Sequence, residues 1–377
     1  MPGESTSGGP LVWFNARGKP VRVCLIGCGR VGQWLLRAFA GSAEQLASRY
    51  GFRPVVVGIA TARHGLISSA AGLDLPTLLD LVEAGRPLTE HPGSRQWPVL
   101  EGMGAIDAEV LVEVTASPAA DGEPGVSHMR AALQRGLAVV TSNKWPVALH
   151  GLELVQLARS NGVTLRAEAT VMSGTPVLST LTEGLAGARP TALRGILNAT
   201  SNFILSDMRR DASYAEALAT AQRVGLAERH PTADVEGYDA VAKLMILAGL
   251  VFGAQLRVDQ VLRQGITGLD RQALEAAASV GARIRPLATL DAAELGQPGS
   301  LTARVQPVAL GPDDPLAGID DARNAVVCRA EPLGEVTIIG PGAGLALAGQ
   351  GVLADLIATA RQRSSSAGRM CMASPDA

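Results

Sequence analysis

Aromatic residues are scarce in this sequence of 377 residues: they make up 3% of it, although hydrophobic residues as a whole make up 47%. A folded core must therefore consist mainly of alanine, valine, leucine and isoleucine. Charged residues are also few, at 18%, and their signs nearly cancel, which leaves a formal net charge of −2. This composition is typical of a globular protein. It gives no general electrostatic reason to expect a nucleic-acid or membrane partner.

Cysteines and long apolar segments are scarce as well. The four cysteines have neither the spacing of a zinc site nor the pattern of a disulfide framework. The apolar stretch Leu244–Ala254 is about half the roughly 20 residues that a membrane helix needs, so we expect a buried helix there. The N-terminal sequence MPGESTSGGP lacks the basic and apolar segments of a signal peptide. A reduced, cytoplasmic protein is the expectation.

Short apolar runs alternate with helical patterns in the first half of the chain. The strands expected there are Val21–Ile26, Val55–Ile59, Val110–Val114 and Ala138–Thr141. Strands that alternate with helices predict βαβ units and a parallel sheet. After about residue 150 the pattern changes. Helices are expected at Gly151–Ser160, Ser201–Arg210, Tyr214–Val224 and Tyr238–Phe252, and further strands at 163–167, 192–197, 301–309 and 325–339.

A glycine-rich turn follows the first expected strand and precedes a helix. Gly27, Gly29 and Gly32 form the pattern G-x-G-x-x-G, with Arg30 and Val31 inside it. The first glycine permits a tight turn, the second leaves room for a pyrophosphate, and the third lets the helix approach the strand. The helix N-terminus then offers free N–H groups to the phosphates. This context predicts dinucleotide binding; a purely structural glycine turn is the alternative.

The residues after the second expected strand bear on the choice of dinucleotide. An NAD-preferring site usually has an acid there that binds the ribose 2′-hydroxyl. This chain reads Ala60-Thr61-Ala62-Arg63-His64, without an acid, and Arg63 can pair with a 2′-phosphate. The sequence therefore slightly favours NADP over NAD, the alternative being that Arg63 is only a solvated loop residue.

Polar residues also follow the third and fourth expected strands. Thr115 lies after one, and Ser142 and Lys144 lie after the other. In open α/β sheets, ligands bind at the carboxyl ends of the strands. This position makes Thr115 and Ser142 candidates for contact with the cofactor, and Lys144 a candidate for contact with both the cofactor and a substrate oxygen. The alternatives are a turn cap for Thr115 and an ordinary surface position for Lys144.

A charged pair begins the apolar helix expected at 238–252. Asp239 and Lys243 are four residues apart, so they share one face of that helix. Because the residues that follow are strongly apolar, the helix should be buried and the pair should lie at its mouth, as a candidate reaction centre. The alternative is an exposed ion pair worth a few tenths of a kcal/mol.

In their order along the chain, these segments resemble the homoserine dehydrogenase family over residues 20–360. Besides the glycine loop, the resemblance is carried by Thr141–Lys144, Glu168–Pro176, Gly195–Leu205, Ala221–Glu228, Asp234–Lys243 and Gly340–Gly344. It implies an α/β protein with an N-terminal Rossmann dinucleotide-binding domain at 20–150, completed by a C-terminal helix at 340–361. An α+β catalytic and dimerisation domain would span 151–339. Segments 1–19 and 362–377 would be a disordered or extended N-terminus and a flexible tail.

The resemblance also implies an activity and roles for particular residues. The reaction would be reversible, NAD(P)-dependent hydride transfer between L-homoserine and L-aspartate 4-semialdehyde, in a homodimeric enzyme of threonine and methionine biosynthesis. The roles implied are catalysis for Lys243, Lys144 and Asp239; substrate binding for Glu228, Asp239, Thr200 and His230; cofactor binding for Gly342; and, through the backbone carbonyls of Glu168, Val171, Ser173 and Thr175, a ring around Na⁺ or K⁺.

Two departures from the family pattern leave the substrate open. His230 stands where the family usually has an aspartate, and Ala199-Thr200-Ser201-Asn202 replaces Gly-Thr-Thr-Asn. Histidine replaces a fixed anion with a group that titrates near neutrality. A specialised paralogue acting on a homoserine-like substrate remains an alternative. So do another Rossmann oxidoreductase, such as a sugar dehydrogenase with a strand-end lysine, and a dinucleotide sensor without turnover. The sequence does not decide which lysine donates the proton.

Overall fold

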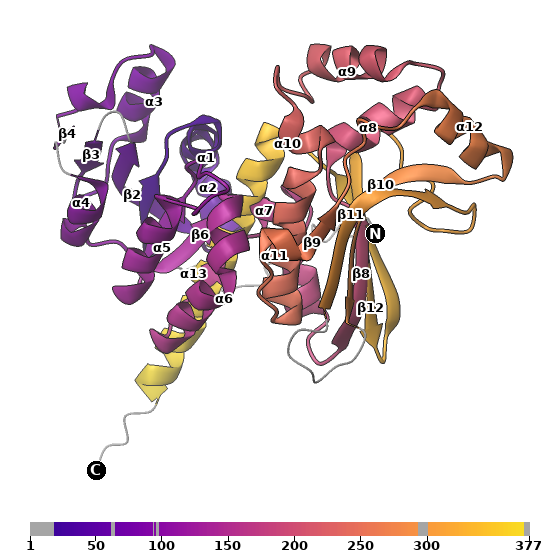
Figure 1. Cartoon of the computed structure of the whole chain (residues 1–377). Helices are drawn as coiled ribbons and strands as arrows, with labels where there is room; N and C mark the ends of the chain where they lie inside the picture. Colours follow the sequence, from indigo (N-terminus) through magenta and orange to yellow (C-terminus); the bar gives the residue numbers. More distant parts are fainter. Residues whose placement is uncertain (1–18, 62–64, 93, 96–97, 293–300, 373–377) are drawn as a thin grey trace, which may run out of the picture. The chain divides into compact units, whose positions relative to one another are not determined.

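The computed structural model of the chain describes residues 19–61, 65–92, 94–95, 98–292 and 301–372 (Figure 1). Arg63 lies outside the described residues, as do 1–18 and 373–377. The chain divides into two compact units, one of Met1–Val112 with Leu353–Ala377 and one of Glu113–Val352. Among the described residues, no helix combines the length and the hydropathy needed to cross a membrane.

The first unit contains the glycine-rich turn. Its elements are β1 (Pro20–Ile26), α1 (Arg30–Gly41), α2 (Ala43–Tyr50), β2 (Arg53–Thr61), β3 (Gly65–Ser68), α3 (Leu75–Glu83), a 3₁₀ turn (Leu88–Glu90), β4 (Ser94–Arg95) and α4 (Val99–Ala105). β1 and β2 pair in parallel, whereas β3 pairs antiparallel to β2. The run of β-branched residues in β2 is buried, as expected of a strand covered on both faces.

The second unit contains most of the remaining elements. They are α5 (Gly125–Gln134), β6 (Ala138–Thr141), α6 (Lys144–Ser160), β7 (Leu165–Arg166), α7 (Ala169–Met172), a π-helical turn (Thr180–Gly184), β8 (Arg189–Ile196), α8 (Ala199–Met208), α9 (Tyr214–Arg223), α10 (Thr232–Val235), α11 (Tyr238–Phe252), a 3₁₀ turn (Val258–Gln260), β9 (Val261–Arg263), α12 (Arg271–Ser279), β10 (Arg283–Ala292), β11 (Leu301–Leu310), β12 (Arg323–Glu331) and β13 (Gly334–Pro341). β5 (Val110–Glu113) and α13 (Leu345–Met372) cross the boundary between the units.

Two sheets organise these strands. One has seven strands in the order β4-β3-β2-β1-β5-β6-β7, and the other has six in the order β13-β12-β8-β10-β11-β9. In the six-stranded sheet, β8, β10, β11, β12 and β13 pair antiparallel. The expected fold class, an α/β nucleotide-binding domain joined to an α+β domain, is confirmed.

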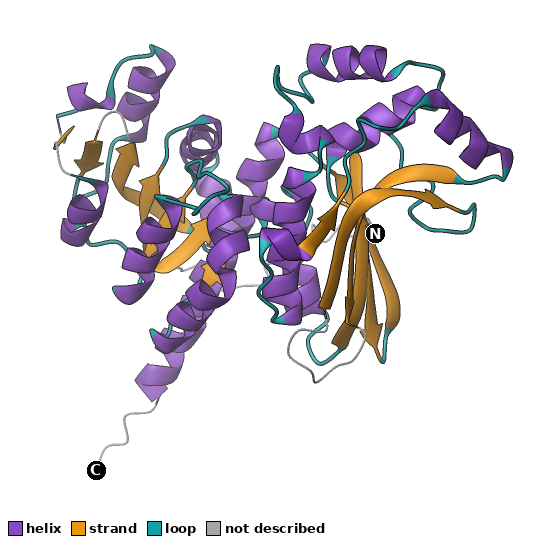
Figure 2. Cartoon of the chain, viewed as in Figure 1, coloured by secondary structure: helices purple, strands orange, loops and turns teal. Residues whose placement is uncertain are grey.

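Helix α11 forms the centre of the second unit. It is apolar on nearly every face, and its residues from Ala240 to Gly249 are buried. Such a helix must be surrounded by protein, and it packs in one core with residues of α6, β8, β10 and β11 (Figures 1 and 2). Gly237 and Gly253, both in the left-handed region with φ 83° and 68°, bound it at either end. This core fixes the first two turns of α11, which carry Asp239 and Lys243.

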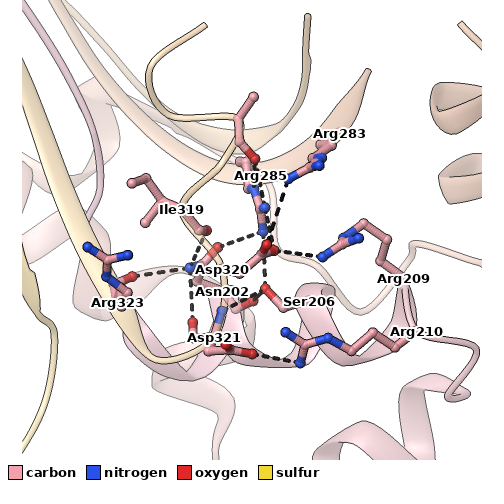
Figure 3. Close-up of polar contacts among 11 residues, drawn as sticks. Asn202, Ser206, Arg209, Arg210, Arg283, Arg285, Ile319, Asp320, Asp321 and Arg323 are labelled. Atoms are coloured by element: carbon pink, nitrogen blue, oxygen red, sulfur yellow. Dashed lines mark hydrogen bonds and ion pairs between the residues drawn. The ribbon is translucent and has the colours of Figure 1, made fainter. Parts of the chain in front are cut away.

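A buried polar network ties α8 to the loop between β11 and β12 (Figure 3). The amide of Asn202 donates to three backbone carbonyls of that loop and its end, those of Ile319, Asp321 and Arg323, at 2.9–3.1 Å. Arg285, 1% exposed, donates to the Ser206 hydroxyl at 3.1 Å and to the Asp320 carboxylate at 2.6 Å. Because each buried donor has a partner, the network holds α8 rigidly.

Several elements differ from the sequence-based expectation, and four of them bear on the second unit or on the C-terminal helix. Helix α6 begins at Lys144 rather than Gly151, since Pro146 is compatible with the first turn of a helix. Strand β10 was not predicted, and it contains Pro286, although proline disfavours a strand interior. Its Pro286 lies opposite Pro307, outside the stretch Ala288–Asp291 that pairs with β8.

The other two differences are in the C-terminal third. Residues 325–339 fall in two antiparallel strands, β12 and β13, because Gly334 adopts φ 84° at the turn between them. Helix α13 extends to Met372, whereas the sequence predicts an end at residue 361. No proline interrupts the chain between residue 361 and Pro375, and the three serines at 364–366 disfavour a helix only modestly.

Candidate active site

The glycine-rich turn has the geometry of an open loop. Gly27 has φ 103°, and its N–H donates to the carbonyl of Ala60 at 2.9 Å. A Cβ on Gly32 would lie 2.3 Å from the Gly27 oxygen, whereas a Cβ on Gly29 would meet no atom within 4 Å. Gly32 is therefore required by packing. The space beside Gly29 is where a pyrophosphate is expected.

The start of α1 leaves its N–H groups without a side-chain cap. Gly29 is the N-cap residue and supplies no side chain. Arg30 is exposed and Val31 is half-buried. Burial raises the pKa of the Cys28 thiol to about 11, with Arg37 opposing the shift. The thiol in this loop is therefore neutral and is no candidate nucleophile.

The centre of the candidate site is a carboxylate that contacts two ammonium groups. Asp239 contacts the Nζ atom of Lys144 through Oδ1, and the Nζ atom of Lys243 through Oδ2 at 2.8 Å. The side chains of Asp239 and Lys243 are 10% and 9% exposed, and that of Lys144 is 38% exposed. The prediction that Asp239 and Lys243 share a helix face is confirmed, and their burial excludes the exposed ion pair.

Backbone and amide groups hold this cluster in place. Lys243 donates to the Leu197 carbonyl at 2.7 Å, and the Asn324 amide donates to the same carbonyl at 3.0 Å. Asn198, at the N-cap of α8, donates from one amide nitrogen to Asp239 at 2.9 Å and to Asp234 at 2.7 Å. The ends of β8, α8 and α11 thus fix the orientation of both carboxylates.

The charges in the cluster shift one another's pKa values. Burial raises the pKa of Asp239, but Lys243 and Lys144 outweigh it, and the net pKa lies far below the usual range. Asp239, chiefly, raises the pKa of Lys144. Burial lowers the pKa of Lys243 despite its contact with Asp239. Of the two lysines, Lys243 therefore releases its proton more readily.

Comparisons with known proteins agree with this geometry. Residues 27–168 match the family model described as homoserine dehydrogenase, NAD binding domain, and residues 176–357 match that of homoserine dehydrogenase. The chain is 40% identical over 337 residues to the NAD(+)-dependent homoserine dehydrogenase of Pseudomonas canavaninivorans, covering 89% of this chain and 95% of that protein. The chain belongs to the homoserine dehydrogenase family.

Other family members are similar over most of the chain. The homoserine dehydrogenase of Mycobacterium tuberculosis is 37% identical over 347 residues, which cover 92% of this chain and 73% of that protein. The solved homoserine dehydrogenase of Thiobacillus denitrificans has a TM-score of 0.77 and 33% identity, covering 92% of this chain and 74% of that one. A hyperthermophilic archaeal homoserine dehydrogenase in complex with NADPH has a TM-score of 0.76, 28% identity and coverage of 91% and 98%. This homoserine dehydrogenase family member is therefore an NAD(P)-dependent oxidoreductase that acts on a CH–OH group.

Of the residues predicted to bind substrate, Asp239 lies in the lysine cluster, whereas Glu228 and His230 lie on the loop that follows α9. Glu228 and His230 are exposed, and among the described residues neither side chain bonds to the Asp239 cluster. Thr200 is buried, and its hydroxyl donates to the Leu226 carbonyl at 2.9 Å. Thr200 therefore connects α8 to the loop that carries Glu228.

The segment predicted to ring a cation is a compact turn. The buried carboxylate of Glu168 accepts three backbone N–H bonds, each of 2.7 Å, from Val177, Leu178 and Ser179. Ser173 adopts φ 55°, in the left-handed region, and the carbonyl of Thr175 accepts from Val177 at 2.9 Å. The described residues contain no cluster of acidic, histidine or cysteine side chains suited to a metal ion.

Gly342 lies against the polar residues of the cluster. A Cβ at this position would be 2.2 Å from the Asn324 oxygen and 2.9 Å from the Ala199 side chain. Only glycine fits beside the amide that holds the Leu197 carbonyl.

The sequence-based reasoning missed Asn198, Asp234 and Asn324. The first two lie within the segments that carry the family resemblance, where an asparagine preceding a helix and a second acid near Asp239 were the available signals. Asn324 had none, because it is linked to Leu197 only by the pairing of β12 with β8.

Proposed function

We propose that Lys243, Lys144 and Asp239 carry the reversible interconversion of L-homoserine and L-aspartate 4-semialdehyde. The observation that supports this assignment best is the Asp239 carboxylate shared by two lysines, one of them buried. When bound, the nicotinamide supplies the hydride chemistry. The chain supplies a proton and positive charge to the oxygen that changes its bonding.

Lys243 is the proton donor in the reduction and the proton acceptor in the oxidation. Among the residues that the structure describes, Asp239 and the Leu197 carbonyl are its partners, so one of its three N–H groups is left for a substrate oxygen. Burial lowers its pKa, so Lys243 exchanges its proton more readily than Lys144 does. Lys144, whose pKa is raised, remains charged and stabilises the oxygen.

Substrate binding by Glu228, Thr200, His230 and Asp239 is part of the same proposal. The exposed carboxylate of Glu228 suits the ammonium group of an amino acid, and the bond from Thr200 to Leu226 holds its loop to α8. His230 offers no fixed negative charge, so a specialised paralogue that accepts a homoserine-like substrate remains the second candidate.

For the cofactor, we propose contacts with the loop from Gly27 to Gly32, with Thr115, Ser142 and Lys144, and with Gly342. NADP is favoured over NAD because no acid follows β2 and because of Arg63. The family uses both: the Pseudomonas relative is named for NAD(+), and the archaeal structure holds NADPH. Comparing kcat/KM for each cofactor, in the wild type and in Arg63→Ala, tests the preference; an NAD-favouring wild type would contradict it.

We further propose a cytoplasmic homodimer that acts in threonine and methionine biosynthesis and binds Na⁺ or K⁺ at the carbonyls of Glu168, Val171, Ser173 and Thr175. Leu333, in the turn before β13, and Ile339, in the edge strand β13, are 57% and 42% exposed, which supports a contact between copies. The tight turn at Ser173 supports the cation site. Light scattering measures the oligomeric state, and activity in sodium and in potassium salts measures the dependence on the cation.

A panel of substrates tests the main proposal. NAD(P)-linked oxidation of L-homoserine is measured beside sugars and other amino alcohols. Homoserine should give the highest kcat/KM. A preference for a sugar would indicate a different Rossmann oxidoreductase, and cofactor binding without any turnover would indicate a sensor.

A further inference from the structure

A buried carboxylate at the end of β5 has no part in the reaction proposed above. Glu113 is 0% exposed. Its backbone carbonyl accepts from the Thr141 hydroxyl at 2.7 Å, which joins the ends of β5 and β6. A buried carboxylate is unfavourable unless hydrogen-bond donors surround it.

Both oxygens of the Glu113 carboxylate accept hydrogen bonds, from Thr115 and from Asn143. Thr115 donates through its hydroxyl and through its N–H, the latter at 3.3 Å, both to Oε1. The amide of Asn143 donates to Oε2 at 3.0 Å. The buried Nδ1 atom of His128 lies 3.7 Å from Oε1. These contacts match an acceptor-only carboxylate beside one group that can carry positive charge.

The contacts fix the chemical character of Thr115. Its hydroxyl hydrogen points to Glu113, and its oxygen accepts from the Asn143 amide at 3.3 Å. The only group that Thr115 has left for a ligand is the second lone pair of its hydroxyl oxygen. Thr115 therefore offers an acceptor, which suits a ribose hydroxyl or a carboxamide N–H group and not a phosphate.

The same carboxylate determines how α6 begins. Asn143 is the N-cap residue of α6, yet its side chain does not cap the helix. Instead its amide donates to Glu113 and to the Ser117 hydroxyl at 2.8 Å. Lys144 is the next residue and the first of the helix. Glu113 therefore orients the turn on which Lys144 lies.

We propose that Glu113 is a positioning residue for the cofactor, acting through Thr115 and Asn143, and that it restricts Thr115 to accepting hydrogen bonds from the uncharged part of the dinucleotide. This rests on the proposed function for the identity of the ligand. The proposal adds the buried Glu113 to the cofactor site, where it sets the direction of the Thr115 hydrogen bond.

The test compares three variants by direct NADPH binding, measured by nucleotide fluorescence without substrate. Glu113→Gln keeps the volume but turns one oxygen into an NH₂ group that faces donors. We expect the Kd for NADPH to rise about tenfold, the size of a lost hydrogen bond to a charged group, with KM for homoserine changing less. Glu153→Gln is the matched control, because Glu153 is an exposed carboxylate on α6 that pairs with Arg130 of α5. Its Kd should equal that of the wild type.

A double-mutant cycle separates positioning from a general effect on folding. If Glu113 acts partly through Thr115, the double variant Glu113→Gln/Thr115→Val should raise the Kd by less than the product of the two single effects. Additive effects, or an unchanged Kd for Glu113→Gln, would overturn the proposal. If Glu113→Gln does not fold, Thr115→Ser and Thr115→Val are compared instead, because both keep the carboxylate. The Kd of Thr115→Ser for NADPH should equal that of the wild type, and the Kd of Thr115→Val should be higher. Equal Kd values for the two variants would overturn the proposal. Absence of homoserine turnover in a wild type that binds NADPH would contradict the proposed function alone.

Discussion

Two lysines share one aspartate, yet their surroundings give them different acidities. Lys243 is buried among apolar residues of α11, which disfavours its charged form. Lys144 lies at the more exposed side of Asp239, where attraction to the carboxylate outweighs burial. Equal contacts with one carboxylate therefore do not make the lysines equivalent.

Lys243→Ala should lower kcat for homoserine oxidation by roughly 10²-fold or more, the scale of losing acid–base assistance. Cofactor Kd should change little, since Lys243 contacts Asp239 and Leu197. Steady-state kinetics and NADPH fluorescence measure the two quantities. Lys19→Ala, an exposed position, is the control. A near-normal kcat for Lys243→Ala would leave Lys144 as the donor.

The pH profile of homoserine oxidation should move in opposite directions in two other variants. Oxidation requires Lys243 to accept a proton, so kcat rises with pH through its pKa. Lys144 lowers that pKa and Asp239 raises it. Lys144→Ala should therefore shift the acid limb to higher pH, and Asp239→Asn should shift it to lower pH. Shifts in the same direction would show that the limb belongs to another group.

His230→Asp should raise kcat/KM for homoserine, because it adds negative charge two residues from Glu228, where the substrate ammonium is proposed to bind. The exposure of His230 means that the exchange should leave the melting temperature unchanged. Kinetics on homoserine and on longer amino alcohols measure the effect. Identical kinetics in both proteins would exclude this position from substrate choice.

At the scale of single elements, substitutions at two glycines of one loop should affect different properties, one the stability of the protein and the other its affinity for the cofactor. Gly32→Ala places a Cβ against the Gly27 carbonyl, and such overpacking destabilises by about 1–3 kcal/mol. Gly29→Val enters open space, so the protein should keep its melting temperature and lose cofactor affinity. Thermal unfolding and NADPH titration distinguish the two effects. Undiminished affinity in Gly29→Val would remove the pyrophosphate from this loop.

Elements with a strong local pattern were predictable. Tyr238–Phe252 was predicted with the bounds that the structure has, because a continuous apolar run between two glycines admits little else. Strands β1 and β5 were predicted to within one residue at each end, because both are valine-rich apolar runs. Strand β10 was not predictable, because the sequence does not reveal that Pro286 faces Pro307.

The site was predictable where the family resemblance named residues, and less so where contacts bridge distant segments. Lys144 and Asp239 are 95 residues apart, so spacing alone does not pair them. Glu113 was not predicted as a site residue, because the sequence does not show that Thr115 and Asn143 lie against its side chain.

At the scale of the whole molecule, α13 belongs to the first unit from Leu353 onward. Leu356 is 0% exposed, and Arg363 pairs with Glu109 at 2.9 Å. Leu356→Ala should destabilise the protein by about 2–5 kcal/mol and weaken NADPH binding at temperatures near the transition. Ala354→Ser, at an exposed position, should change stability by no more than about 0.5 kcal/mol. Equal melting temperatures would show that the helix is dispensable to the unit.

The return of α13 to the first unit has a consequence for biosynthesis. Residues up to Val112 leave the ribosome early, but the helix that completes their unit is made only after all of Glu113–Val352. At ordinary elongation rates this delay is on the order of ten seconds or more. The nascent nucleotide-binding segment therefore spends that time with apolar surface uncovered, and the internal unit has the first opportunity to fold. Chaperone demand in the cell should accordingly concentrate on the N-terminal part of the chain, even though it is synthesised first.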